Sequence, residues 1–176
     1  MTLGAAAFDK RIAAAISIAP LIDTTGNPER RQAILELVMH DRANQLLTGE
    51  EPMYLPYIRE DGSIPNGLQL PPDMIPSLER LGVPIENRIS VQTYHRSLSW
   101  NVSDLVPHIS PTPVLMVTPE LDKSCPAEEQ LACYERIGEP KELDILKGKG
   151  HIDWIFGDVD DILSRQLDFL KRRMAF

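Results

Sequence analysis

The stretch PVLMVT at residues 113–118 is the clearest strand signal in the chain. Its residues are nearly all apolar or β-branched and do not alternate with polar ones, which is typical of a strand buried on both faces of a parallel sheet. Two further short runs predict strands: IAAAISIA at residues 12–19, closed by Pro20, and ELDIL at residues 142–146. We therefore expect a parallel sheet of about three strands.

Helical patterns separate these strands. Asn27-Pro28-Glu29 combines a capping side chain, a proline at the first helical position and an acid in the first turn, so it predicts a helix that ends near Thr48-Gly49. Strands that alternate with helices indicate an α/β fold with flanking helices. The other helices are predicted at residues 92–106 (stopped by Pro107), 127–137 and 159–174. In the helix at residues 159–174, six residues are predicted to form one apolar face: Val159, Ile162, Leu163, Leu167, Leu170 and Met174.

The composition bounds the class of protein. The chain has 176 residues, 43% of them hydrophobic, and 18 basic against 26 acidic residues give a net charge of −8. One domain with a sizeable core is expected, and neither nucleic acid nor an anionic membrane suits so acidic a chain. The two cysteines fit a reducing compartment, and the sequence shows no membrane-length apolar run and no basic signal-peptide start. We therefore expect a cytoplasmic location.

Two chemically capable side chains follow the last two predicted strands. Asp122 comes shortly after the strand that ends at Thr118, and His151 follows the strand that ends at Leu146. Sites in open α/β sheets lie beyond the carboxyl ends of the strands, so these loops can meet. A carboxylate that holds one imidazole nitrogen orients the other as a general base. The alternative is a solvated loop aspartate and an unrelated histidine.

The segments PTPVLMVTPELDKSCP and PKELDILKGKGHIDWIFG, followed by an amphipathic helix, resemble the C-terminal part of an α/β-hydrolase. The resemblance is to the dienelactone-hydrolase and Xaa-Pro-peptidase-like branch, which includes fungal hydrolases of polyketide pathways. AAAFDKRI at residues 5–12 resembles the helix tail after the nucleophile and the start of the next strand. The implied fold is a single, incomplete α/β-hydrolase domain over residues 1–176. Its helical cap insertion would be residues 21–110, and residues 111–176 would bear the acid and the histidine.

This resemblance implies Asp122 as the acid and His151 as the base of a catalytic triad. The activity it implies is that of a serine hydrolase or acyl transferase, which acts on a small ester or thioester of secondary metabolism through an acyl-enzyme. No Gly-x-Ser-x-Gly elbow occurs in the chain, and the resemblance would put it just before Met1. No nucleophile is therefore assigned here. The alternative is a catalytically inactive, hydrolase-derived binding or assembly module.

Three aromatic residues are candidates for the lining of an acyl pocket, with core or lid packing as the alternative: Tyr54, Tyr57 and Trp154. The first two lie in a stretch rich in proline, glycine and aromatic residues, 52–72, that we expect to be a lid or binding loop. Asp73 is predicted to cap a short helix through Arg80.

Cys125 is a possible replacement nucleophile, weighed against a structural thiol. His40, His95 and His108 have no second ligand at metal-binding spacing, so we predict no metal site. No phosphate-binding or dinucleotide-binding glycine motif occurs, and we predict no cofactor. The strand at Ile12–Ala19 would leave one edge bare, which predicts that the chain either forms a homo-oligomer through that edge or is poorly soluble.

Overall fold

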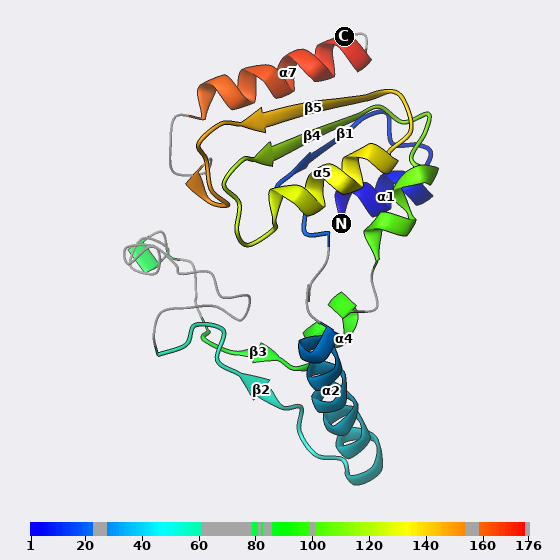
Figure 1. Cartoon of the computed structure of the whole chain (residues 1–176). Helices are drawn as coiled ribbons and strands as arrows, with labels where there is room; N and C mark the ends of the chain where they lie inside the picture. Colours follow the sequence, from blue (N-terminus) through cyan, green and yellow to red (C-terminus); the bar gives the residue numbers. More distant parts are fainter. Residues whose placement is uncertain are drawn as a thin grey trace. The chain divides into compact units, whose positions relative to one another are not determined.

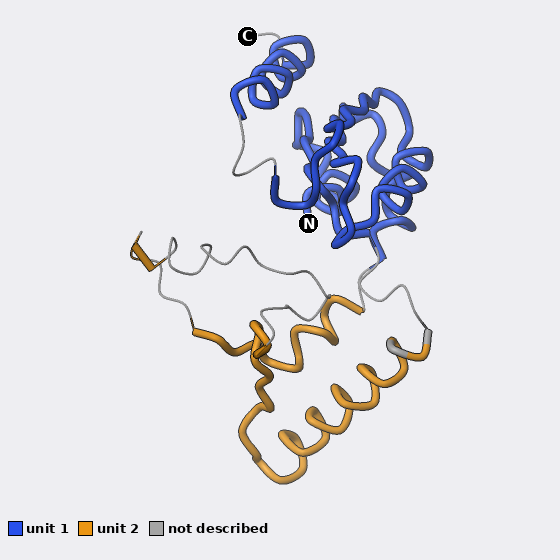
Figure 2. The backbone as a smooth tube through the Cα atoms, turned by 60° about the vertical axis from the view of Figure 1, so that its left-hand side comes forward, with its two compact units in different colours: residues 1–23, 101–176 blue, residues 24–100 orange. Residues whose placement is uncertain are grey.

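The computed structural model describes residues 1–22, 28–60, 79–80, 82, 86–98, 101–153 and 159–174. The chain divides into two compact units, which Figure 2 shows in different colours. Unit 1 comprises residues 1–23 and 101–176, and unit 2 comprises residues 24–100.

A three-stranded parallel sheet forms the centre of unit 1 (Figure 1). Strand β4 (Val114–Pro119) pairs with β1 (Ala15–Ile18) on one side and with β5 (Lys141–Leu146) on the other. All six residues of β4 are buried, as the unalternated sequence predicts for a central parallel strand. The predicted α/β class and three-stranded parallel sheet are confirmed.

Helices cover both faces of this sheet. Helix α1 (Thr2–Phe8) and helix α5 (Ala127–Arg136) lie on one face, and helix α7 (Asp160–Met174) lies on the other, as Figure 1 shows. Side chains of β4 alternate between two cores: Val114 and Met116 enter the first, and Leu115 and Val117 enter the second. This alternation follows from the two-residue period of a strand, and it explains why every position of β4 is apolar or small.

The buried face of α7 differs from the predicted one. Ile162 and Phe169, seven residues apart, pack on the sheet, whereas Leu163 and Leu167 remain 55% and 54% exposed. The stripe that packs is therefore rotated toward Phe169, whose large ring fills the space over the sheet. The two exposed leucines line a groove of about 580 Å³, together with Ile16 of β1.

The predicted helix at residues 92–106 is wrong. Helix α4 (Gln92–Leu98) ends earlier, and after an undescribed dipeptide two 3₁₀ turns follow, η1 (Val102–Asp104) and η2 (Val106–His108). Asn101 has an extended backbone, and its side chain accepts a hydrogen bond from the Ser103 N–H, so it starts a new turn. Pro107 is tolerated inside η2 because a short turn needs no amide donor from it.

Unit 2 contains helix α2 (Pro28–Thr48), α4 and a short antiparallel pair, β2 (Tyr54–Leu55) with β3 (Ile89–Ser90). Helix α2 has the predicted bounds. The start of the predicted loop at residues 52–72 is partly a strand, and residues 61–72 and Asp73 lie outside the described residues. Among the described helices, none combines the length and apolar character that a bilayer span needs.

A buried carboxylate ties unit 2 together. Asp41 of α2 accepts hydrogen bonds from Gln45 Nε2 at 2.7 Å, from Gln92 Nε2 at 2.5 Å and from the Met53 N–H at 2.8 Å. Burial alone raises the pKa of the Asp41 carboxyl, but these hydrogen bonds together favour the ionised form more strongly, so its pKa is lowered.

We expect Asp41→Ala to lower the free energy of unfolding by about 2 kcal/mol at neutral pH, because the donors around it lose a charged acceptor. A lowered folded-state pKa gives stability that is present above the unfolded value of about 4 and lost as the pH falls through the folded value. Urea denaturation followed by circular dichroism should therefore show that the difference in the free energy of unfolding between this variant and the parent protein becomes smaller in acid.

Glu36→Ala is the matched control, since Glu36 is an exposed carboxylate of the same helix that also accepts from a glutamine, Gln32, at 2.8 Å. Its effect should stay within about 0.5 kcal/mol. Equal effects of the two substitutions would contradict the assigned role of Asp41.

Candidate active site

The loops after β4 and β5 are tied to each other at the carboxyl end of the sheet. The Glu120 N–H donates to the Leu146 carbonyl at 3.1 Å, and the Leu121 N–H donates to the Lys149 carbonyl at 2.8 Å. The Glu120 carboxylate in turn accepts from Lys147 Nζ at 2.7 Å. These bonds continue the pairing of the strands into the loops, so the residues that follow Leu121 and Lys149 are brought side by side.

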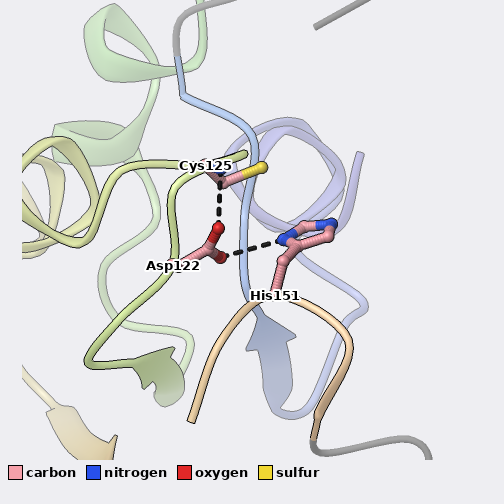
Figure 3. A group of neighbouring side chains, drawn as sticks. All are labelled: Asp122, Cys125 and His151. Carbon is pink, nitrogen blue, oxygen red and sulfur yellow. Dashed lines mark hydrogen bonds and ion pairs between the residues drawn. The ribbon is translucent and has the colours of Figure 1, made fainter. Parts of the chain in front are cut away.

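Asp122 is the centre of this loop pair. Its side chain is fully buried, and Oδ1 accepts the backbone N–H groups of Ser124 at 2.9 Å and Cys125 at 2.8 Å. Oδ2 accepts from Gln130 Nε2 at 3.2 Å and lies 2.9 Å from His151 Nδ1 (Figure 3). Four donors around one carboxylate satisfy both oxygens, which is the condition for burying a charge at acceptable cost.

The contact with Asp122 defines the tautomer of His151. A carboxylate surrounded by donors can only accept, so the shared proton is on His151 Nδ1. The Nε2 lone pair is then the basic site of the ring. The His151 side chain is 27% exposed, so the ring lies between the buried acid and the surface. This arrangement is that of an oriented general base.

The turn before His151 is set by two glycines and an acid. Gly148 has φ +65°, a conformation that glycine adopts without strain. The Gly150 N–H donates to Asp153 Oδ2 at 2.7 Å, and a Cβ on Gly150 would lie 3.1 Å from that oxygen. Asp153 therefore holds the loop through the backbone.

Cys125 lies beside the acid and the histidine. Its Sγ is within 4.8 Å of a ligand atom of each of Asp122 and His151, and Figure 3 shows the sulfur near the imidazole. Burial raises the pKa of the Cys125 thiol to about 12, and the negative charges of Asp122 and Glu129 add to the effect. A thiol in this environment stays protonated and is a poor nucleophile.

The same three residues are the group that could hold a metal ion among the residues the structure describes. Their donor set would suit a zinc-like cation. Binding would have to remove a proton from Cys125 and displace hydrogen bonds from Asp122, whose oxygens are satisfied. The geometry fits a hydrogen-bonded acid–histidine pair better than a metal centre, and the absence of a metal site stays a prediction.

The structure brings Asp122 and His151 together, and it does not test the three predicted aromatic residues. Tyr54 and Tyr57 belong to unit 2 and are 46% and 40% exposed, with the Arg88 guanidinium 4.6 Å from the centre of the Tyr54 ring. Trp154 lies outside the described residues. The roles of all three in substrate binding stay predictions, as does the cap at residues 21–110, within which all of unit 2 lies.

Sequence analysis missed Gln130. It lies on α5, is completely buried and bonds to Asp122, yet a single glutamine in a helix carries no motif. Its one signal is its place on the inward face, which Cys133 and Ile137 share at spacings of three and seven residues.

No protein-family model matches the chain. It is 74% identical over 176 residues to polyketide transferase grgF of Penicillium sp., covering all of this chain and 60% of that protein. It is 32% identical over 178 residues to a thiohydrolase of Eupenicillium brefeldianum, covering 97% of this chain and 58% of that protein. The crystal structure of the α/β hydrolase GrgF from Penicillium sp. sh18 matches with a TM-score of 0.84 and 75% identity, over 99% of this chain and 60% of that one.

The fold and these likenesses show that the chain belongs to the α/β-hydrolase superfamily. It spans about 60% of the length of the curated relatives it matches, so its three-stranded sheet represents part of the α/β-hydrolase fold. Those relatives are fungal polyketide transferases and thiohydrolases.

The environment of Cys125 predicts slow alkylation. With a pKa of about 12, about one Cys125 thiol in ten thousand is ionised at pH 8. In a Cys133→Ala background, which leaves Cys125 as the one cysteine, iodoacetamide should label the folded protein about a thousandfold more slowly than the unfolded protein, as followed by mass spectrometry. The Cys125→Ala, Cys133→Ala double variant sets the background. Labelling of the folded chain at the unfolded rate would identify Cys125 as an accessible thiolate.

Proposed function

We propose that this chain carries the acid–base half of an acyl-transfer site, with Asp122 as the orienting acid and His151 as the general base. The observation that carries the proposal is the 2.9 Å contact between Asp122 Oδ2 and His151 Nδ1, made by a buried and fully hydrogen-bonded carboxylate. The substrate class we propose is a small polyketide-like acyl group held as a thioester or ester. The names of the relatives, polyketide transferase and thiohydrolase, support this choice.

The proposed mechanism follows from the position of the proton. His151 Nε2 takes the proton of an attacking nucleophile as its bond to the acyl carbon forms, and the Asp122 carboxylate stabilises the resulting imidazolium. The imidazolium then gives this proton to the leaving thiolate or alkoxide as the acyl–sulfur or acyl–oxygen bond breaks. A second cycle passes the acyl group to water, which is hydrolysis, or to another nucleophile, which is transfer.

The nucleophile is the part that this sequence does not provide. No Gly-x-Ser-x-Gly motif occurs in its 176 residues, and the protonated Cys125 thiol is unsuited to the role. We place the nucleophile and its oxyanion donors on a segment that precedes Met1 in the longer protein, as the resemblance to α/β-hydrolases implies. The missing motif is also what favours the second candidate function, a catalytically inactive binding or assembly module.

We further propose a cytoplasmic location, for which the two buried free thiols of Cys125 and Cys133 give support. A homo-oligomer through the edge of β1 is the proposed assembly. The N–H groups of Ala15 and Ala19 donate to β4, so those of Ile16 and Ile18 point toward the opposite edge. That edge adjoins the groove lined by the exposed leucines of α7.

The activity test uses two forms of the protein. In the protein extended by the reading frame upstream of Met1, His151→Ala and Asp122→Asn should each lower kcat for an acyl thioester by about 10³- to 10⁴-fold. The matched control is His108→Ala, because His108 is an exposed histidine of the same unit that lies on η2. It should leave kcat unchanged.

The chain of 176 residues, tested alone on a p-nitrophenyl ester, should give no turnover beyond that of its His151→Ala variant. Turnover that His151→Ala abolishes would show that the chain holds its own nucleophile. An extended protein that is inert, or one in which His151→Ala has no effect, would favour the binding module.

The assembly test is size-exclusion chromatography with light scattering. We expect the 176-residue chain to form a dimer or larger species, because the edge of β1 and the neighbouring leucines bury apolar surface on pairing. Leu167→Lys should shift the chain toward a monomer. Leu121→Lys, at a leucine that is 57% exposed on the loop after β4, is the control and should not. A monomer at all concentrations tested would contradict this assembly.

A further inference from the structure

The amide of Gln130 contacts two acceptors in the Asp122 loop. Nε2 is 3.2 Å from Asp122 Oδ2 and 2.5 Å from the Cys125 backbone carbonyl. Gln130 is completely buried and comes from α5, so it links the helix that follows the loop to both ends of the loop itself. Neither contact belongs to the regular hydrogen bonding of a helix or a sheet.

The chemistry of the neighbours fixes the orientation of this amide. A carboxylate and a backbone carbonyl are both acceptors, so only the NH₂ group of Gln130 can face them. The flipped amide would put its oxygen against two other oxygens in a dry interior, where that repulsion is strong. Gln130 is therefore a double donor.

Asp122 Oδ2 is the oxygen that also faces His151. The Gln130 donor and the His151 ring share this one atom, whereas two backbone N–H groups of the loop hold Oδ1. Rotation about the Cβ–Cγ bond moves both oxygens, so it would weaken the two Oδ1 contacts and carry Oδ2 away from the ring. The amide from α5 blocks that rotation and holds the loop carbonyl of Cys125 at the same time.

We propose that Gln130 is a positioning residue that holds Asp122 Oδ2 in line with His151 Nδ1. It touches neither substrate nor reacting atoms and acts through Asp122. The proposal rests on the proposed function for its catalytic consequence, but its structural content, the geometry of the acid–histidine hydrogen bond, is measurable without turnover.

Unit 2 supplies a matched control with the same chemistry. Gln92 Nε2 donates to Asp41 Oδ2 at 2.5 Å and to the Val38 carbonyl at 3.1 Å, so it too joins a buried carboxylate to a backbone carbonyl. The Asp41 carboxylate also accepts from Gln45 and from the Met53 N–H, and all of these residues belong to unit 2. Gln92→Met thus removes an equivalent pair of hydrogen bonds and leaves the contacts of Asp122 and His151 intact.

The experiment records the low-field proton resonance of His151 Nδ1–H, assigned by its loss in His151→Ala. Gln130→Met keeps the length and volume of the side chain but removes both donors. We expect it to shift this resonance upfield or broaden it through solvent exchange, whereas Gln92→Met leaves the resonance in place. Thermal denaturation should show comparable losses of stability in the two variants, which separates positioning from general destabilisation.

Gln130→Glu tests the donor directly. Two carboxyl groups in contact share a proton, so the carboxyl group that this substitution introduces can donate to Asp122 while that proton is retained. On the acid side, where the two carboxyl groups still share a proton, the Nδ1–H resonance should therefore keep the position it has in the parent protein. As the pH rises and the shared proton leaves, the resonance should move away from that position. A purely structural role would not give this pH dependence.

In the extended protein, Gln130→Met should lower kcat by up to about a hundredfold with KM little changed, because a small misplacement of the base affects the transition state most. An unmoved resonance in a folded Gln130→Met variant would overturn the positioning role, as would an equal shift in Gln92→Met. If His151→Ala leaves kcat unaffected, the proposed function fails instead, whatever the resonance shows.

Discussion

The burial of one carboxylate, that of Asp122, organises the loops at the carboxyl end of the sheet in unit 1. A charge removed from water needs a donor for each lone pair, and here the loop backbone, α5 and the loop after β5 each contribute. The strand order β1-β4-β5 makes this possible, because it places the ends of β4 and β5 side by side. His151 is thus one of the partners that the buried acid requires, and its orientation follows from that need.

Sequence analysis found the parts of the structure that depend on local patterns. The strand β4 was evident because a central parallel strand is buried on both faces and therefore reads as an unbroken apolar run. The bounds of α2 followed from its proline start and glycine end. The meeting of Asp122 and His151 followed from the rule that loops at the carboxyl ends of neighbouring parallel strands converge.

The parts that were missed depend on tertiary packing. The apolar pattern of residues 92–106 continues across Asn101, but the Asn101 side chain starts a new turn there and the pattern alone does not show it. The buried stripe of α7 is set by where Phe169 fits over the sheet. Gln130 is recognisable only once its amide is seen against Asp122. The chain belongs to the α/β-hydrolase superfamily and spans about 60% of the length of the relatives it matches.

The most direct test of the acid–histidine pair is the tautomer of His151 at neutral pH, measured from the ring nitrogen chemical shifts of ¹⁵N-labelled protein. We expect the neutral ring to carry its proton on Nδ1, with Nε2 as the basic nitrogen, and we expect this preference to weaken in Asp122→Asn. A neutral ring protonated on Nε2, or a ring whose shifts are the same in the parent protein and in Asp122→Asn, would contradict the pairing on which the proposed chemistry depends.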